Sequence, residues 1–240
     1  MFLGLSGLLK RKQKREVTQQ VQPQRKLAGA IIDIHEHIIV PAMMYPTFPA
    51  NQFDRVINGW DYVRYSTLGL AAQRILRDNV PGAFAEAGVW KGHCASFMHM
   101  FAPERPLYLF DTFEGFPNSG ESKGDRRFAD TTVEEVLANV GEPTQSVFIR
   151  KGVFPETSKG LEDETFSLVS LDLDTYSGML SAWKFFYPRT SRGGYIFVHD
   201  YNGHEYEDGT GRATREFLSD KIEQAIELSD QWGSALIRKS

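Results

Sequence analysis

The sequence predicts an α/β protein whose core is a doubly wound, mostly parallel sheet of seven strands with an antiparallel hairpin at its C-terminal end. In the middle of the chain, short apolar runs such as Leu107–Phe110 and Tyr195–Val198 alternate with helical segments. Apolar runs without polar alternation are typical of parallel strands that helices cover on both faces. Two further segments, 225–228 and 235–238, flank a Gln-Trp-Gly turn and predict the hairpin.

Hydrophobic periodicity and chain-breaking residues set the expected boundaries. Segment 60–79 has apolar side chains near a helical period, and Pro81-Gly82 ends it. Pro188 stops a later helix, and Asp130 or Thr131 is expected to cap another. The expected strands are 83–89, 106–111, 146–150, 166–172 and 194–199, and the expected helices are 60–79, 92–101, 130–139, 177–187 and 214–220.

The start of the chain differs in composition from the rest. Residues 1–26 carry seven Lys or Arg side chains and one acid, whereas the remaining residues carry 20 basic and 30 acidic side chains. We therefore expect a basic flexible arm over 1–26, an N-terminal helical cap over 27–81 and a ligand-binding α/β domain over 82–240. Because basic residues follow a short apolar start, peripheral contact between the arm and an anionic membrane is a further expectation.

Bulk properties argue against several classes of protein. The net charge of −4 speaks against general nucleic-acid binding. Cys94 is the single cysteine, so no intrachain disulfide can form, and a reducing, cytoplasmic location is expected. The apolar runs are too short to span a bilayer. The apolar start precedes the basic residues, which is the reverse of the order in a signal peptide.

The turn after the first predicted strand has the features of a nucleoside cradle. Gly88 and Gly92 let the backbone turn tightly and approach a ligand, at the sheet edge where open α/β sheets bind ligands. The next strand ends in Asp111, 19 residues after Gly92, where an acid can accept hydrogen bonds from ribose hydroxyls. Glu86 suits a cationic ligand group better than a pyrophosphate. A plain strand–helix turn explains the glycines equally well.

Acidic side chains follow two later strands. Asp172 and Asp174 come at the end of the fourth predicted strand, and His199 and Asp200 come at the end of the fifth. Because these strands are neighbours in a doubly wound sheet, Asp172 and Asp200 are expected to face each other. Two converging carboxylates need a proton or cation between them, and their oxygen ligands suit Mg²⁺ or Mn²⁺. Such an ion would hold a substrate hydroxyl while Asp174 takes its proton.

Simpler roles remain open for the same residues. One Asp can cap the following helix while the other is solvated in a loop. His199 fits a metal ligand, a general base or a neutral histidine bonded to backbone.

The longer strings around these residues point to a family. They are Glu86-x-Gly88-Val89-Trp90-Lys91-Gly92, Tyr108–Phe116, Leu171–Tyr176, Tyr187-Pro188-Arg189 with Gly193-Gly194, and His199-Asp200-Tyr201. Together they resemble the macrocin O-methyltransferase family of class I methyltransferases, over about residues 60–240. The resemblance implies a Rossmann-like sheet with strand order 3-2-1-4-5-7-6, S-adenosylmethionine as methyl donor and usually Mg²⁺. It also implies a small-molecule hydroxyl acceptor such as a sugar, and a homo-oligomer.

The site residues of the family can be assigned to matching positions of this sequence. At His199 the family commonly has a second acid, so the metal site here is expected to be weaker, differently filled or metal-free. A neutral imidazole would still ligate, but it favours a softer ion than Mg²⁺. The loops 114–128 and 202–213 are expected to cover the site. The resemblance implies Glu86, Gly88, Gly92, Asp111, Thr112 and Phe113 at the cofactor, Asp172, Asp200 and His199 at the metal, and Asp174 and His199 in catalysis.

Three other functions remain open on the sequence. The first is a nicotinamide-dependent oxidoreductase, which the missing Gly-x-Gly-x-x-Gly fingerprint disfavours. The second is a non-catalytic nucleoside-binding module, which the departure at His199 keeps open. The third is a membrane-associated methyltransferase that acts on a lipid-linked glycan, docked by the basic arm.

Overall fold

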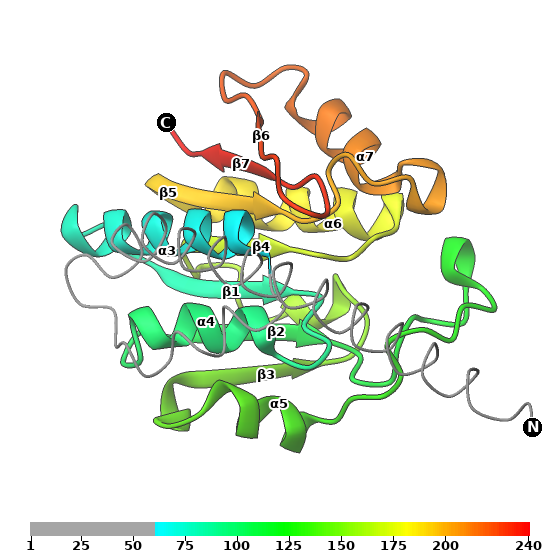
Figure 1. The fold of residues 1–240 in the computed structure, drawn as a ribbon, viewed down its shortest axis with the longest axis horizontal. Helices are drawn as coiled ribbons and strands as arrows, with labels where there is room; N and C mark the ends of the chain where they lie inside the picture. Colours follow the sequence, from blue (N-terminus) through cyan, green and yellow to red (C-terminus); the bar gives the residue numbers. More distant parts are fainter. Residues whose placement is uncertain (1–60) are drawn as a thin grey trace, which may run out of the picture. The chain divides into compact units, whose positions relative to one another are not determined.

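The computed structural model describes residues 61–240, which form one α/β unit (Figure 1). The predicted arm over 1–26 and the cap residues 27–60 lie outside the described residues. The seven strands form a single sheet with the order β3-β2-β1-β4-β5-β7-β6, which is the order that the family resemblance implies. Neighbouring strands pair in parallel from β3 to β5, and β7 pairs antiparallel with β5 and β6. The predicted fold class is therefore confirmed.

The observed elements lie close to the expected ones. The strands are β1 (Ala83–Ala87), β2 (Leu107–Asp111), β3 (Val147–Lys151), β4 (Phe166–Leu171), β5 (Thr190–Val198), β6 (Ile226–Glu227) and β7 (Ala235–Arg238). The α-helices are α3 (Tyr62–Arg77), α4 (His93–Phe101), α5 (Val133–Val140), α6 (Tyr176–Phe186) and α7 (Gly209–Leu218). Short 3-10 helices span Gly120–Ser122, Thr144–Ser146, Glu156–Ser158, Tyr187–Arg189 and Glu205–Glu207.

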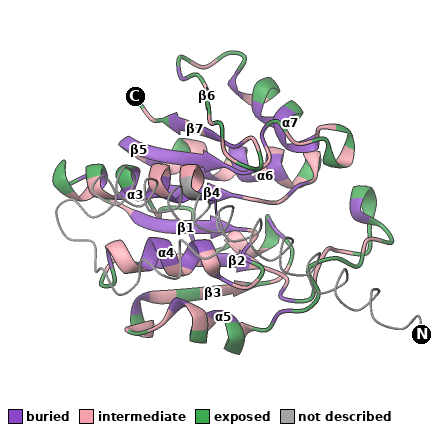
Figure 2. Ribbon diagram, viewed as in Figure 1, coloured by how far each residue is buried: buried purple, intermediate pink, exposed green. Residues whose placement is uncertain are grey.

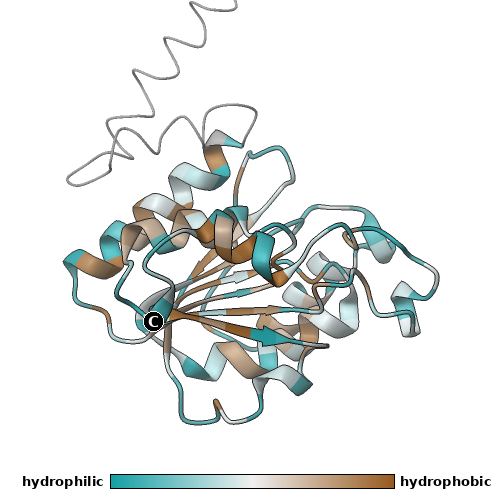
Figure 3. Ribbon diagram, turned by 90° about the horizontal axis from the view of Figure 1, so that it is seen from below, coloured by the Kyte–Doolittle hydropathy of each residue, from teal (hydrophilic) through white to brown (hydrophobic). Residues whose placement is uncertain are grey.

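The sheet has helices on both faces, with α3, α4 and α5 on one side and α6 and α7 on the other (Figures 1 and 3). The central strands are buried throughout, whereas β3 at the edge is half-exposed (Figure 2). Trp183 and Phe186 of α6 pack under the sheet, and Leu68 and Ile75 of α3 are fully buried above it. Burial of these large apolar side chains is the main stabilising term of the fold. In the described part of the chain, no helix is long and apolar enough to cross a membrane.

Strand register places the functional edge of the sheet. Ala87 at the end of β1 pairs with Phe110 of β2 and with Leu171 of β4, and Leu171 pairs with Val198 of β5. The four central parallel strands therefore end level with one another. The residues that follow them emerge at one edge, as ligand-binding residues do in open α/β sheets.

The N-cap of helix α5 differs from the expectation. Thr132, and neither Asp130 nor Thr131, caps α5 by accepting a hydrogen bond from the Glu135 amide at 3.1 Å. The Asp130 carboxylate instead accepts from the Trp90 indole at 2.9 Å, and the Thr131 hydroxyl donates to the Trp90 carbonyl at 2.6 Å. Both side chains are therefore engaged in holding the turn after β1.

The last α-helix begins five residues earlier than expected. Its first turn contains two glycines that pack closely against neighbouring backbone. Helix α7 starts at Gly209, where a Cβ would lie 2.8 Å from the Asp174 carbonyl oxygen. A Cβ at Gly211, two residues further on, would clash in the same way with the Tyr201 carbonyl oxygen. These glycines read as chain breakers in the sequence, although they serve a close helix–loop contact.

Candidate active site

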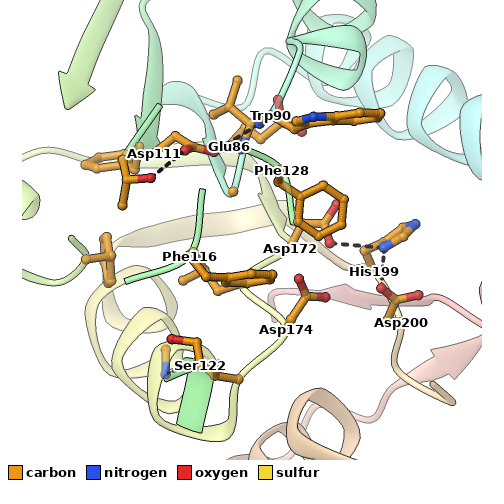
Figure 4. Close-up of a pocket in the computed structure, with 18 of the residues that line it drawn as sticks. Glu86, Trp90, Asp111, Phe116, Ser122, Phe128, Asp172, Asp174, His199 and Asp200 are labelled. Carbon is orange, nitrogen blue, oxygen red and sulfur yellow. Dashed lines mark hydrogen bonds and ion pairs between the residues drawn. The ribbon is translucent and has the colours of Figure 1, made fainter. Parts of the chain in front are cut away.

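A cavity of about 750 Å³ opens at the carboxyl ends of β1, β2, β4 and β5. Its wall is formed by the turn after β1, the loops after β2, β3 and β4, the segment after β5 and the turn before β7. Figure 4 shows Glu86 and Asp111 on one side of this cavity and Asp172, Asp174, His199 and Asp200 on the other. Four of the six predicted cofactor residues thus share one chamber with the predicted acid cluster: Glu86, Gly88, Asp111 and Thr112.

Asp111 accepts hydrogen bonds from backbone amides on the side of the cavity where the cofactor is predicted to bind. Its Oδ2 accepts from the amides of Val89 at 2.7 Å and Trp90 at 3.0 Å, and its Oδ1 accepts from the Phe113 amide at 2.8 Å. A carboxylate offers about four lone-pair positions, so it retains capacity for a ligand hydroxyl. The end of β2 is therefore tied to the turn after β1 in a defined geometry.

Gly88 brings the two halves of the site into backbone contact. Its φ of +85° lies in the left-handed region that glycine adopts without strain. A Cβ at this position would overlap with the backbone carbonyl oxygen of Asp172. The turn after β1 and the end of β4 therefore touch directly, and only glycine permits this approach.

Glu86 is a buried acid without a full set of partners. The residue is 2% exposed, lines the cavity, and its Oε2 has no hydrogen-bond partner among the described residues. Burial raises the pKa of Glu86 to about 8, and the nearby Arg64 guanidinium opposes that rise. A buried carboxyl group of this kind is costly when ionised unless a cation lies beside it.

We expect Glu86→Gln to make the protein more stable above pH 5 and to flatten its stability across pH 5–8. The folded pKa of about 8 exceeds the ordinary value of 4.5, so folding favours the protonated form. The stability associated with this proton is complete below about pH 4.5 and is lost as the pH rises to about 8. The gain in the variant should be on the order of a few kcal/mol at pH 8.

Urea unfolding of the ligand-free protein at several pH values measures this effect. Glu104→Gln removes an exposed acid by the same chemical change and serves as the control. A Glu86→Gln variant whose stability follows the wild-type pH curve would contradict the buried, protonated state of Glu86.

The opposite side of the cavity holds the cluster Asp172, His199 and Asp200. His199 Nδ1 lies 3.0 Å from Asp172 Oδ1 and 2.9 Å from Asp200 Oδ2. One ligand atom from each residue lies within 4.8 Å of the others. The side chains of Asp172 and Asp200 are 24% and 18% exposed, so the cluster is accessible from the cavity. The predicted meeting of the two strand ends is therefore present.

Charge within the cluster is partly compensated by the protein itself. Burial works against ionisation of Asp172, but His199 and Arg64 hold the pKa of its carboxyl below the ordinary value. Burial likewise opposes protonation of His199, and Asp172 raises its pKa to about 9. Arg64 Nη2 of helix α3 lies 3.5 Å from Asp172 Oδ2. The oxygen Oδ1 of Asp172 faces the histidine while Oδ2 faces the guanidinium.

The donor set fits a divalent cation. Asp172, His199 and Asp200 each offer a ligand atom within 4.8 Å of the other two, which is close enough for one ion to contact all three. The distances of 3.0 and 2.9 Å from His199 Nδ1 to the carboxylate oxygens are those of hydrogen-bonded ion pairs, which a bound ion would replace once His199 loses its proton. Two carboxylates with one imidazole suit Mn²⁺ better than Mg²⁺, because Mg²⁺ prefers oxygen ligands. Arg64 would then contact the free oxygen of a ligating carboxylate.

Asp174 lies next to the cluster in a constrained conformation. Its φ is 58°, it is 8% exposed, and its backbone carbonyl accepts a hydrogen bond from the Thr210 hydroxyl at 3.2 Å. Burial, and then the charges of Asp172 and Asp200, raise the pKa of Asp174 well above its ordinary value. Asp174 can accept a proton only in its ionised form, which a cation beside Asp172 and Asp200 would favour by offsetting their negative charges.

Aromatic side chains cover the mouth of the cavity. Phe128 contacts Trp90 and Phe116 edge-on, with ring centroids 5.6 and 5.4 Å apart, and Phe116 contacts Tyr206 at 5.7 Å. Arg127 lies over Phe116 and Phe128 and forms an ion pair with Glu205 at 2.8 Å. These contacts join the loop after β2 to the segment after β5, as expected for the two loops that cover the site.

Not every predicted residue reaches the cavity, and others do so without having been predicted. Phe113 is buried and offers Asp111 its amide, while Gly92 adopts a φ of 76° as the cap of α4. Neither is on the cavity wall, whereas Thr112 is. Arg64, Trp90, Phe116, Phe128 and Trp232 also line the cavity, although none of them is among the site residues predicted from the sequence.

The strand order β3-β2-β1-β4-β5-β7-β6, with the cavity at the carboxyl ends of the parallel strands, is that of the class I methyltransferase fold. The family model of macrocin O-methyltransferase (TylF) matches residues 61–238, and the chain belongs to this family. The resemblance in the sequence is thereby confirmed.

Individual relatives agree with this assignment. Demethyldecarbamoylnovobiocin O-methyltransferase of Streptomyces niveus is 28% identical over 156 residues, which are 58% of this chain and 60% of the relative. A second relative, from Streptomyces olivaceus, is 28% identical over 168 residues, which cover 59% of this chain and 64% of the relative. Its name is 8-demethyl-8-(2,3-dimethoxy-alpha-L-rhamnosyl)-tetracenomycin-C 4'-O-methyltransferase. The chain thus spans less than two thirds of either relative. The structure of the O-methyltransferase NovP superposes with a TM-score of 0.66 at 21% identity, covering 75% of this chain and 80% of NovP.

Proposed function

We propose that the protein transfers a methyl group from S-adenosylmethionine to a hydroxyl of a sugar or natural-product acceptor. The observation that carries this proposal is the direct contact at Gly88, which sets the nucleoside cradle against the acid cluster in one cavity. The two relatives named above are O-methyltransferases of natural products, and one name contains a rhamnosyl group. Both facts support a hydroxyl acceptor.

The cofactor side suits the charges and hydroxyls of S-adenosylmethionine. Asp111 would accept a hydrogen bond from a ribose hydroxyl at the end of β2, through the lone-pair position that the three amides leave free. Glu86, whose Oε2 lacks a partner, would face the cationic amino group or sulfonium. The N-terminus of α4 has no side-chain cap, so its amides are available to the cofactor's carboxylate.

On the acceptor side, the residues would position and deprotonate a hydroxyl. S-adenosylmethionine supplies an electrophilic methyl carbon: an O–C bond forms as the C–S bond breaks, and S-adenosylhomocysteine leaves as a neutral thioether. The ionised carboxylate of Asp174 would take the hydroxyl proton, and burial beside Asp172 and Asp200 increases its affinity for that proton. Phe116 and Phe128 would exclude water above the reacting atoms.

We further propose that Asp172, His199 and Asp200 hold a divalent cation, which would act as a Lewis acid for the acceptor hydroxyl. The convergence of one ligand atom from each residue to within 4.8 Å of the others supports this assignment. A site with an imidazole ligand should bind Mn²⁺ at least about tenfold more tightly than Mg²⁺. His199→Asp should narrow that preference, because it makes every donor an oxygen.

Calorimetric titration of the full chain with MnCl₂ and MgCl₂ measures the metal preference without reference to activity. His204→Asp makes the same change at an exposed position of the neighbouring segment and serves as the control. Equal affinities of the wild type for the two ions would contradict the proposal that His199 is a ligand. Absence of binding for both ions would contradict the proposal that the cluster holds a metal.

Calorimetric titration with S-adenosylhomocysteine, followed by mass spectrometry of sugar and phenol acceptors incubated with S-adenosylmethionine, tests the proposed function. Binding together with a 14 Da gain on an acceptor supports it. Binding without turnover on any acceptor would favour the non-catalytic nucleoside-binding module. Failure of S-adenosylhomocysteine to bind would contradict the methyltransferase proposal and would favour the nicotinamide-dependent oxidoreductase.

Three further parts of the proposal rest on the sequence alone. They are a homo-oligomeric state, a cytoplasmic location, and peripheral membrane contact through residues 1–26. Liposome flotation of the chain with and without residues 1–26 measures the membrane contact. Binding that requires residues 1–26 would support a lipid-linked glycan as the acceptor.

A further inference from the structure

Asp174 stands between the end of β4 and the start of α6, in a backbone conformation that its surroundings must hold. Its φ of 58° lies in the left-handed region, which is unfavourable for a residue with a Cβ. Such a conformation persists where several neighbouring contacts fix it. The contacts of the flanking backbone therefore decide where the Asp174 carboxyl group points.

The start of α6 is fixed by a carboxylate from the loop 114–128, which follows β2. Glu121 Oε2 accepts hydrogen bonds from the Ser177 amide at 2.9 Å and from the Ser177 hydroxyl at 2.6 Å. Ser177 is the second residue of α6 and comes three residues after Asp174. Amides in the first turn of a helix have no partner within the helix, and a carboxylate there also interacts favourably with the helix dipole. Glu121 is therefore a helix cap supplied from 56 residues away.

This cap completes the one that α6 provides for itself. The N-cap residue Thr175 accepts a hydrogen bond from the Gly178 amide through Oγ1 at 3.2 Å, and its carbonyl accepts one from the Met179 amide at 3.0 Å. The Ser177 amide lies between these two groups in the first turn and donates to Glu121 instead. The loop 114–128 thus takes part in the first turn of the helix that follows Asp174.

The same loop is attached a second time, on the other side of Asp174. Asp125 accepts a hydrogen bond from the hydroxyl of Tyr206, in the segment after β5. This segment leads directly into α7, where the Thr210 hydroxyl donates to the Asp174 carbonyl at 3.2 Å. The two attachments of the loop therefore reach the neighbourhood of Asp174 through different helices, α6 and α7.

We propose that Glu121 is a positioning residue for the reaction. By capping α6 from the loop 114–128, it holds the backbone that carries Asp174 and couples closure of the loop to placement of the proton acceptor. This inference rests on the proposed function, in which Asp174 takes the proton of the acceptor hydroxyl. When the loop opens, α6 loses part of its cap and Asp174 loses one of its supports. Proton abstraction is then confined to the closed cavity, from which water is excluded.

Hydrogen exchange of the full chain, measured by mass spectrometry with S-adenosylhomocysteine present, tests this coupling without an acceptor. Glu121→Ala should speed exchange in the first turn of α6, residues 176–179, by about tenfold, because the cap is lost. Exchange in α4 should stay unchanged, which shows that the fold is intact. Glu121→Gln keeps an acceptor oxygen of similar reach and should restore most of the protection.

A matched control removes a carboxylate from another helix start. Glu134 is exposed in the first turn of α5, and Glu134→Ala should leave exchange at residues 176–179 as in the wild type. Wild-type exchange at residues 176–179 in Glu121→Ala would overturn the inference.

A double-mutant cycle in kcat distinguishes a positioning role from a general loss of stability. On the acceptor found by screening, Glu121→Ala should lower kcat by about tenfold in the wild-type background. In the Asp174→Asn background, where no carboxylate remains to be positioned, the same change should lower kcat by less than about twofold. Equal factors in the two backgrounds would show that Glu121 acts independently of Asp174 and would overturn the inference.

The outcomes separate this inference from the proposed function. Failure of S-adenosylhomocysteine to bind, or a wild-type kcat in Asp174→Asn, would overturn the proposed function and with it the role of Glu121. A large loss of kcat in Asp174→Asn together with a wild-type kcat in Glu121→Ala would overturn the inference alone.

Discussion

Replacing Asp174 with asparagine is expected to lower kcat by about 10²–10⁴-fold, the usual contribution of a general base. The amide cannot take the acceptor's proton, although it has nearly the size and shape of the carboxyl group. Asparagine also tolerates the left-handed conformation that Asp174 adopts at φ 58°, so the backbone beside Gly209 should be preserved. Affinity for S-adenosylhomocysteine should stay unchanged, because the substitution lies on the acceptor side.

Steady-state kinetics on the acceptor found by screening, with calorimetry of S-adenosylhomocysteine in parallel, measures both parts of this result. Asp163→Asn, at an exposed acid before β4, controls for the loss of one charge. A kcat within about threefold of the wild type would show that another group or solvent takes the proton. Equal losses of kcat and cofactor affinity would indicate a structural role for Asp174.

The second large effect concerns Asp111. Asp111→Ala should weaken S-adenosylhomocysteine binding by about 10–10²-fold through the lost ribose contact alone. Three backbone amides already donate to Asp111, so about one lone-pair position remains, and a hydrogen bond to a charged acceptor is worth about 1.5–3 kcal/mol, where 1.4 kcal/mol corresponds to tenfold. The variant also releases the amides of Val89, Trp90 and Phe113, which hold the turn after β1 in place.

Calorimetry distinguishes these two contributions when Asp111→Asn is measured beside the alanine variant. The asparagine variant keeps one acceptor oxygen for the turn but loses the charge, so an intermediate affinity is expected. Asp163→Ala, distant from the turn in sequence and exposed, serves as the control. Wild-type affinity in Asp111→Ala would place the ribose elsewhere in the cavity.

Much of this site could be predicted because parallel strands impose a strict geometry. Once 166–172 and 194–199 were recognised as neighbouring strands, Asp172 and Asp200 had to emerge at the same edge, and the register of Leu171 with Val198 places them there. The same rule placed Asp111 beside the turn at Gly88. Their proximity follows from topology and needs no knowledge of side-chain packing. Their roles in cofactor and metal binding stay predictions.

Other contacts could not be predicted, because they join elements whose relative orientation no local pattern specifies. Arg64 meets Asp172 because helix α3 packs against β4 and β5, which nothing in the period of segment 60–79 reveals. Glu121 reaches the start of α6 from a loop 56 residues earlier in the chain. The capping of α5 by Thr132 was missed because Asp130 and Thr131 are engaged by Trp90.

The sequence by itself determined the alternation of strands and helices, the family, and which acids stand at the ends of the strands. These properties follow from local periodicity and from short strings of residues, which do not depend on how the chain folds in space. Only the tertiary structure decided which charges those acids meet. The pairing of Arg127 with Glu205, of Glu121 with the start of α6 and of Arg64 with Asp172 depends on how loops and helices pack across the cavity. Electrostatic energy falls with distance and with solvent exposure, so it is set by that packing and by nothing local in the chain.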